Sequence, residues 1–236
     1  MENSTLLGKK PNRSLNPRLV LYPVLALLAF MNIVSPVAAA EHKHGEIKDT
    51  AAYIAMLEDT ARKDWQKPSE VLKALNLSKG DTVADIGAGT GYFSVLFAEA
   101  VGNNGIVYAV DIDEKLVDYL KKRDKDAGIK NIKIVKSEPG NPLLAPQSID
   151  LVFICNTWHH IEKRDKYLQL LYESLRQNGR LVMVDYIYKE TPFGPPLSER
   201  IPREKLIEEC KQGKFSLYGE YYFLPYQYFL IFSRMD

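Results

Sequence analysis

Several features that assign a protein to a specialised class are missing from this sequence. It has only two cysteines, Cys155 in an apolar run and Cys210 in a charged run, too few for a disulfide framework. We expect both thiols to be unpaired, with Cys155 acting as a small buried apolar residue. There is no internal repeat, and 46% apolar with 26% charged residues is ordinary globular composition. The composition therefore gives no indication of a disulfide scaffold, a fibre or disorder.

An excess of one charge is also missing. The chain carries 31 basic and 30 acidic residues, and its formal net charge is +1. Basic residues are interspersed with acidic ones, as in residues 121–126, which we interpret as a solvated helix end. Nucleic-acid-binding proteins usually present a basic stripe or patch. We therefore expect a small-molecule substrate and no nucleic-acid partner.

The apolar run near the N-terminus is short for a membrane span. It extends from Leu19 to Val34, 16 residues, whereas roughly 20 are needed to cross a bilayer. Basic residues precede it and small residues follow it, which is the order of a secretory signal cleaved after Ala40. We predict a signal peptide at residues 1–40 and export, to the periplasm if the source is bacterial. An uncleaved inner-membrane anchor is the alternative, and membrane contact is expected only through this segment.

Two further regions follow the predicted signal. Residues 41–80 are expected to form a polar linker and a helical lead-in, with one helix over residues 50–63 and a second from Trp65 to about Leu75. Pro68 falls in the first turn of the second helix, where proline is tolerated. Residues 81–236 are expected to form the main domain.

Strand and helix patterns alternate from Thr82 onward, which predicts a parallel sheet with helices on both faces. The expected strands are 82–86, 106–111, 132–136, 149–155 and 180–186. The expected helices are 92–100, 114–124, 164–176 and 203–211, and the third is predicted to stop at Asn178-Gly179. Two aromatic, strand-like runs, 214–222 and 226–232, follow as a hairpin-like pair.

The most informative motif joins the first strand to the next helix through Asp85, Gly87, Gly89 and Gly91. Glycine has no Cβ and adopts positive φ, so alternating glycines permit a tight bend and close approach of a ligand to the backbone. The following helix offers unpaired N–H groups to an anionic group. A tight strand-to-helix turn without a ligand is the alternative, and Asp85 can then be a buried carboxylate that supports the loop.

A second carboxylate, Asp111, ends the next strand 20 residues after Gly91. From this position an acid can accept hydrogen bonds from both ribose hydroxyls of a nucleotide. It can instead cap the helix that begins near Glu114. Because Asp113 also precedes that helix, we assign the ribose to Asp111 and the N-cap to Asp113.

Together with the strand at 148–152 and the turn at 175–179, these motifs resemble the class I S-adenosylmethionine-dependent methyltransferases. Residues 65–68, the pair His159-His160, residues 194–196 and residues 224–228 resemble a bacterial subgroup of predicted methyltransferases with export signals. The resemblance covers about residues 65–232. It implies a three-layer, Rossmann-like α/β fold with a mostly parallel seven-stranded sheet and an antiparallel last strand, and S-adenosylmethionine as cofactor.

The resemblance also implies roles for individual residues. The three glycines would face the methionine part of the cofactor, Asp85 its amino or carboxylate end, and Asp111 the ribose. Glu138 stands where the family often has an acid near the adenine amine, although residues 137–140 depart from the common pattern. The cofactor contacts implied in full are Asp85, Gly87, Ala88, Gly89, Gly91, Asp111, Ile112, Glu138 and Asn156.

Candidate catalytic and substrate-binding residues lie beyond the fourth strand and near the helical lead-in. His159 or His160 is the candidate general base, or else a substrate or metal contact, because ligands bind at the carboxyl ends of parallel strands. The competing interpretation is that one histidine caps a helix or packs under the loop. Asp185 is the only nearby acid for a metal, so we predict no metal site. Trp65 and Tyr226 are candidate substrate contacts, with core packing as the alternative.

The sequence therefore predicts a methyltransferase with an unidentified acceptor. A nicotinamide-dependent oxidoreductase is an alternative that Tyr92 disfavours, because this tyrosine stands where the third glycine of a dinucleotide fingerprint is usual. A non-catalytic protein that binds an adenosyl ligand is the other alternative. The sequence does not predict the oligomeric state.

Overall fold

The structure is a computed structural model that describes residues 49–235. All the described residues belong to one compact unit. The predicted signal peptide and the first part of the predicted linker lie outside the described residues. Between residues 49 and 235, no helix has the length and apolar character needed to cross a bilayer.

Seven strands form one sheet in the order β3-β2-β1-β4-β5-β7-β6. The first five strands pair in parallel, and β7 is antiparallel to both of its neighbours, β5 and β6. The predicted mostly parallel seven-stranded sheet with an antiparallel last strand is confirmed. The strands are β1 (Thr82–Ile86), β2 (Ile106–Asp111), β3 (Ile132–Lys136), β4 (Ile149–Cys155), β5 (Leu175–Tyr186), β6 (Phe215–Tyr221) and β7 (Gln227–Arg234).

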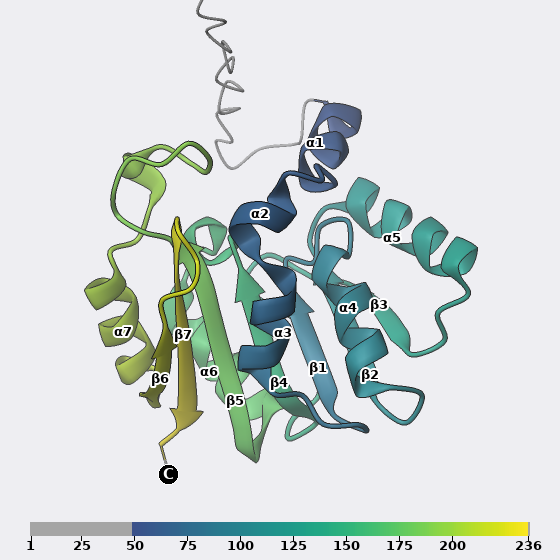
Figure 1. The fold of residues 1–236 in the computed structure, drawn as a ribbon. Helices are drawn as coiled ribbons and strands as arrows, with labels where there is room; N and C mark the ends of the chain where they lie inside the picture. Colours follow the sequence, from purple (N-terminus) through teal and green to yellow (C-terminus); the bar gives the residue numbers. More distant parts are fainter. Residues whose placement is uncertain (1–48, 236) are drawn as a thin grey trace, which may run out of the picture. The chain divides into compact units, whose positions relative to one another are not determined.

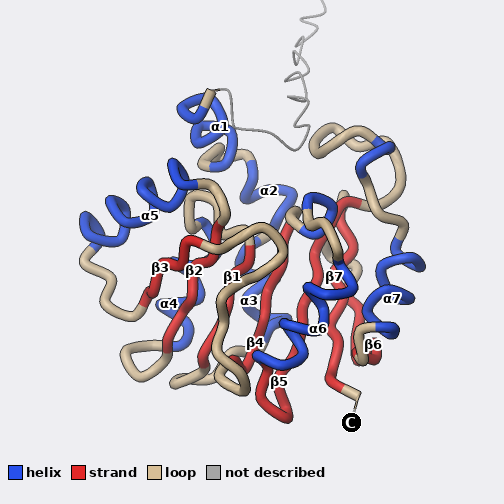
Figure 2. The backbone as a smooth tube through the Cα atoms, turned by 180° about the vertical axis from the view of Figure 1, so that it is seen from behind, coloured by secondary structure: helices blue, strands red, loops and turns tan. Residues whose placement is uncertain are grey.

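Helices cover both faces of the sheet, which gives the three expected layers. Side chains of α3 and α4 share one hydrophobic cluster with the sheet, and those of α6 and α7 share the other. The two layers are visible from opposite sides in Figures 1 and 2. The helices are α1 (Thr50–Leu57), α2 (Arg62–Gln66), α3 (Pro68–Leu75), α4 (Tyr92–Val101), α5 (Glu114–Ala127), α6 (Arg164–Ser174) and α7 (Arg203–Gln212), with short 3-10 helices η1 (Trp158–His160) and η2 (Leu197–Glu199).

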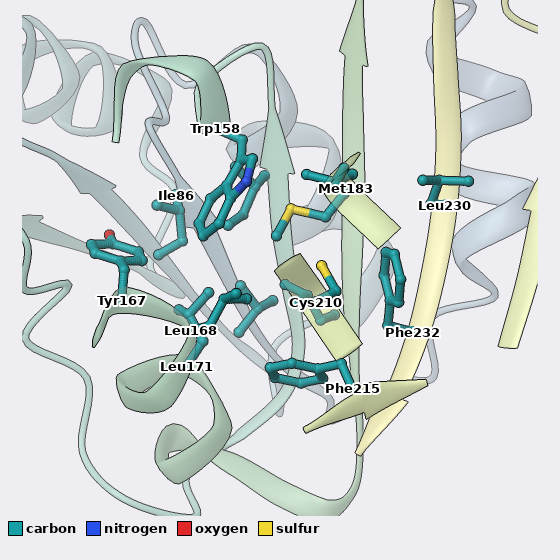
Figure 3. Close-up of a cluster of buried hydrophobic side chains, with 14 of the residues drawn as sticks. Ile86, Trp158, Tyr167, Leu168, Leu171, Met183, Cys210, Phe215, Leu230 and Phe232 are labelled. Carbon is teal, nitrogen blue, oxygen red and sulfur yellow. The ribbon is translucent and has the colours of Figure 1, made fainter. Parts of the chain in front are cut away.

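Large apolar side chains fill the space between each helical layer and the sheet. Figure 3 shows the cluster under α6 and α7, which includes Trp158 of η1, Met183 of β5 and Phe215 of β6. On the opposite face, the rings of Phe97 and Phe153 meet edge to face with their centroids 5.0 Å apart. Aromatic pairs in this geometry stabilise a core beyond the area that they bury. The central strands are thereby held firmly beneath the ends that carry the predicted site.

Two predicted helices end earlier than the sequence pattern indicates. The helix predicted over residues 50–63 stops at Leu57, because the Asp59 carboxylate accepts the N–H of Ala61 and forms a local turn. The helix predicted over 164–176 stops at Ser174, because Leu175 already pairs with Ile149 as the first residue of β5. Tertiary pairing of a fully buried leucine overrides helical periodicity here.

The carboxyl ends of β1, β2, β4 and β5 meet at one edge of the sheet. Figure 1 shows α1 and α2 at the same edge, above the ends of β1 and β4. Residue contacts agree with this view, since Gln66 of α2 donates a hydrogen bond to the Cys155 sulfur of β4 at 2.9 Å. The helical lead-in is therefore folded onto the edge that carries the predicted site.

Candidate functional site

The turn between β1 and α4 contains the three predicted glycines, all with positive φ: +70° at Gly87, +59° at Gly89 and +80° at Gly91. A Cβ on Gly87 would lie 2.2 Å from Oγ1 of Thr157, and one on Gly91 would lie 2.5 Å from Cδ2 of Leu120. Glycine is therefore required at both ends of the turn by the protein's own packing, in addition to any ligand.

The Asp111 carboxylate lies against this turn. It accepts the N–H of Gly89 at 2.8 Å and the N–H of Asp113 at 2.9 Å, and the side chain is buried. Burial raises the pKa of Asp111, and the backbone N–H bonds act in the opposite direction. Each carboxylate oxygen keeps a further lone pair, so the acid can still accept hydroxyl groups while it holds the turn.

Asp113 caps α5, as the sequence predicts. Its Oδ1 accepts the N–H groups of Lys115 at 2.8 Å and Leu116 at 3.1 Å. This leaves Asp111 free of the capping role. The predicted N-cap role of Asp113 is therefore confirmed.

Asp85 is buried at the end of β1 and accepts a hydrogen bond from Oγ of Ser94 in α4 at 2.6 Å. Burial raises the pKa of Asp85 to about 7, although the bond from Ser94 and the nearby Arg62 guanidinium lower it. The carboxyl group therefore supports the first turn of α4 and changes its charge near neutral pH.

Buried polar atoms without a hydrogen-bond partner border this edge of the sheet. Within the described residues, three of them are Oγ1 of Thr90 in the turn, the hydroxyl of Tyr92 at the start of α4, and Oε1 of Gln227 at the start of β7. Such atoms are rare in native proteins and often mark the place of an absent water or ligand. Their position agrees with a polar ligand over the turn.

The remaining predicted cofactor residues occupy different surroundings. Ile112 is 51% exposed directly after Asp111, and Glu138 is exposed just after β3, where it pairs with Asn141. Ala88 is buried in the turn. Asn156 has φ +55° beyond β4, and its Oδ1 accepts a hydrogen bond from Gln227 at 2.5 Å.

The two predicted histidines lie in η1, directly beyond β4. Nδ1 of His159 lies 2.9 Å from Oδ2 and 3.0 Å from Oδ1 of Asp185 at the end of β5, and both side chains are buried. The ring of His160 lies beside that of His159, with centroids 4.1 Å apart. A carboxylate partner assigns the Nδ1 proton of a neutral imidazole, so Nε2 of His159 carries the free lone pair. Within residues 49–235, no group of three or more histidine, cysteine or acidic side chains is placed to hold a metal ion.

Trp65 and Tyr226, the predicted substrate contacts, belong to one aromatic cluster. Trp65 stacks on Phe193 with centroids 5.3 Å apart, and it lies 6.1 Å from Tyr186 and 6.4 Å from Tyr226. Trp65 and Tyr226 are half-buried and Phe193 is partly exposed. The cluster brings together rings from four separate segments of the chain, and its Tyr186 ends β5.

Arg200 fixes the loop that carries Phe193. Its guanidinium donates to the backbone oxygens of Pro195 at 2.8 Å, Ile187 at 3.1 Å and Phe193 at 3.2 Å, and also to that of Lys189. The side chain is buried, so these bonds are shielded from water. We refer to residues 187–200 as the Arg200 loop.

A cavity of about 510 Å³ lies between η1, α6 and α7. Of the predicted site residues, His159 lines it, whereas the glycine turn and Asp111 do not. The other lining residues are mostly charged or polar, including the ion pair of Arg164 with Glu209. The cavity therefore borders His159 and does not reach the glycine turn.

Two residues of this edge escape prediction from the sequence. Arg62 lies against Tyr92 of α4, with its guanidinium carbon 4.3 Å from the ring centroid, and Thr157 fills the space above Gly87. Neither residue belongs to a local motif, and each reaches the turn only because the chain folds back. Arg62 falls inside the helix predicted over residues 50–63, where nothing in the sequence marks it as a site residue.

This chain is similar in sequence to known methyltransferases. Residues 77–220 match the model of a family described as a methyltransferase domain. A probable cobalt-precorrin-6B C(15)-methyltransferase (decarboxylating) from Saccharolobus solfataricus is 34% identical over 122 residues, which cover 51% of this chain and 59% of that protein. A ubiquinone/menaquinone biosynthesis C-methyltransferase from Haemophilus ducreyi is 29% identical over 122 residues, covering 51% and 46%.

The matched segment thus spans about half the length of these curated relatives. Among solved structures, a SAM-dependent methyltransferase from Aquifex aeolicus aligns with a TM-score of 0.74 at 27% identity, covering 78% of this chain and 97% of that one. These matches confirm the expected enzyme class over the nicotinamide-dependent alternative. The chain belongs to the methyltransferase domain family, with the fold of the S-adenosylmethionine-dependent methyltransferases.

Proposed function

We propose that this methyltransferase domain transfers the methyl group of S-adenosylmethionine to a small-molecule acceptor. The observation that carries the proposal is the bond from the Gly89 N–H to the buried Asp111 carboxylate, which fixes an acid and a glycine turn together at the carboxyl ends of β2 and β1. The family match over residues 77–220 supports the same assignment.

The residues at this edge fit the chemical parts of the cofactor. Asp111 would accept the ribose hydroxyls, the exposed Ile112 side chain would contact the adenine, and Asp85 would face the amino-acid end. Gly87, Ala88, Gly89 and Gly91 would let the ligand approach the backbone. Glu138 and Asn156 complete the proposed set at the ends of β3 and β4.

The protein's part in the chemistry is mainly alignment. When bound, S-adenosylmethionine supplies an electrophilic methyl group on a sulfonium. Holding an acceptor atom in line with such a group contributes about 7 to 11 kcal/mol in favourable cases. His159, oriented by Asp185, would remove a proton from the acceptor through Nε2, and His160 beside it would support or replace it.

The acceptor is proposed to be small and partly apolar. The aromatic cluster of Trp65, Tyr186, Phe193 and Tyr226 offers ring surfaces at the end of β5. The names of the two relatives refer to a precorrin and to quinones, which are small molecules with ring systems. The near-neutral charge of the chain supports a small molecule over a nucleic acid.

We also propose that residues 1–40 direct export, on the order of basic, apolar and small residues in that segment. The uncleaved inner-membrane anchor remains the alternative. Export requires that the cofactor reach the same compartment as the domain.

Isothermal titration calorimetry tests the cofactor assignment. We expect the protein to bind S-adenosylmethionine and S-adenosylhomocysteine and not NAD. Asp111→Asn should weaken binding about ten- to hundredfold, because the amide loses the charge and one acceptor but still accepts the Gly89 N–H. Asp118→Asn, at an exposed site on α5, is the matched control and should bind like the unchanged protein. Absence of binding by both adenosyl ligands would reject the proposal.

The affinity for S-adenosylhomocysteine should rise between pH 6 and pH 8, because the buried Asp85 carboxyl, with its pKa near 7, must lose its proton to face a cationic amine. Calorimetry in buffers of different ionisation enthalpy should detect proton release near pH 6.5. Asp85→Asn should bind more weakly and without this pH dependence. A pH-independent affinity of the unchanged protein contradicts the assignment.

The stability of the unliganded protein should show the opposite pH trend. The folded-state pKa of Asp85 lies above the unfolded value of about 3.9, so its contribution to folding is fully present below about pH 4. That contribution is lost as the pH rises through about 7. The melting temperature of Asp85→Asn should fall less over this range than that of the unchanged protein.

Labelled methyl transfer tests the role of His159. His159→Asn should lower transfer into an extract by roughly 10² to 10⁴ without weakening binding of S-adenosylhomocysteine. Asp185→Asn should act in the same direction, because it frees the imidazole to adopt the wrong tautomer. His160→Asn compares the two histidines directly.

The destination of the label separates the alternatives. Label in small molecules supports the proposed acceptor class, and label in nucleic acid contradicts it. Tight ligand binding with no turnover in any fraction would favour a non-catalytic adenosyl-binding protein.

Cell fractionation and N-terminal sequencing test the proposed export. We expect a soluble exported form that begins at Glu41. An intact N-terminus in the membrane fraction would identify the anchor instead, and an intact N-terminus in the cytoplasm would rule out both.

A further inference from the structure

Arg62, the first residue of α2, lies at the edge of the sheet that carries the proposed cofactor site. Its Nη1 donates to the backbone oxygen of Leu57 at 2.9 Å, and its Nε donates to the side chain of Gln66. The guanidinium lies over the ring of Tyr92, at the start of α4. These contacts hold the cation between the lead-in and the helix that follows the glycine turn.

This half-buried cation has no carboxylate partner within hydrogen-bond distance among residues 49–235. Asp85 is close enough for the Arg62 charge to lower its pKa, yet the Asp85 carboxylate bonds to Ser94 and not to the guanidinium. A charge withdrawn from water is costly unless it is paired. A guanidinium carries five donors, and Nη2 of Arg62 donates to none of the described residues.

The hydroxyl of Tyr92 is a second unused group at the same place. It is buried and has no partner among the described residues, although the Arg62 guanidinium lies over its ring. Gln66, which orients Arg62, is itself fully buried and bonded to the Cys155 sulfur of β4. The region thus presents an anchored cation and a hydroxyl donor near a buried carboxylate.

That combination is complementary to a free amino acid, which bears a carboxylate and an ammonium group on one carbon. We propose that Arg62, assisted by the Tyr92 hydroxyl, binds the α-carboxylate at the amino-acid end of the cofactor, while Asp85 accepts the α-ammonium. The inference rests on the proposed function and adds a binding residue from outside the glycine turn. Guanidinium and carboxylate match each other in a planar, two-bond geometry.

The placement on α2 gives this contact a second effect. The lead-in already rests on the turn, with Cδ1 of Leu57 only 3.1 Å from where a Cβ of Gly89 would be. An ion pair between Arg62 and the ligand joins α2 to the ligand, and the ligand in turn contacts β1 and β2. Binding of the amino-acid end thereby holds the lead-in over the site.

Calorimetry with two probes tests the proposal in the full-length chain. S-adenosylhomocysteine has the amino-acid end, whereas 5′-methylthioadenosine keeps the adenosine and sulfur and lacks that end. Arg62→Gln should weaken binding of S-adenosylhomocysteine about ten- to hundredfold and leave binding of 5′-methylthioadenosine within about twofold. Arg62→Lys keeps the charge without the fork and should give an intermediate loss.

Matched variants keep the result interpretable. Arg176→Gln removes an arginine that pairs with Asp150 near the amino end of β4, and it should change neither affinity. Tyr92→Phe removes only the hydroxyl, so it tests the same pocket if Arg62→Gln fails to fold, and it should weaken S-adenosylhomocysteine alone. An equal loss for both probes, or no loss for either, in the Arg62 and Tyr92 variants overturns the inference.

The two probes also separate this inference from the proposed function. If the unchanged protein binds neither probe, the proposed function fails. If it binds both equally tightly, the adenosyl site stands and the role of Arg62 is refuted.

Discussion

The hydrogen bond from the Gly89 N–H to the buried Asp111 carboxylate ties the turn after β1 to the end of β2. Because the donor is a backbone group, the bond fixes the course of the chain and not merely a side chain. This turn determines where α4 begins, and Ser94 of α4 donates a hydrogen bond to Asp85. The turn also forms the surface that Leu57 contacts. The proposed cofactor site therefore depends on a carboxylate that holds the turn and that, in our proposal, also binds the ribose.

The two sides of the site are built differently. The proposed cofactor side is covered by α1 and α2, and the segment between these helices is joined to α5 by the 2.6 Å ion pair of Glu58 with Arg123. A partly exposed pair of this kind contributes little to stability. The acceptor side consists of a buried His159–Asp185 pair and packed aromatic rings.

The sheet was largely predictable from the sequence because buried parallel strands appear as short apolar runs between turn residues. All five parallel strands lie where the pattern puts them, apart from the earlier start of β5, and Asp113 caps α5 as expected. Local patterns failed where a distant partner decided the outcome, as at Leu175, which pairs with Ile149. The sequence already placed Asp185 near the two histidines, because both lie at the carboxyl ends of neighbouring strands, but not as the partner of His159. The arrival of Arg62 over Tyr92 was not predicted, since it is not encoded by spacing along the chain.

Arg200 holds the Arg200 loop through backbone oxygens and not through the loop's side chains. Its donors satisfy backbone oxygens of four residues, so the course of the Arg200 loop depends on main-chain groups that every residue type possesses. Side chains on this loop, such as Phe193 against Trp65, are correspondingly free to change. Substitutions at positions such as Phe193 can therefore change the proposed substrate-binding surface without changing the fold.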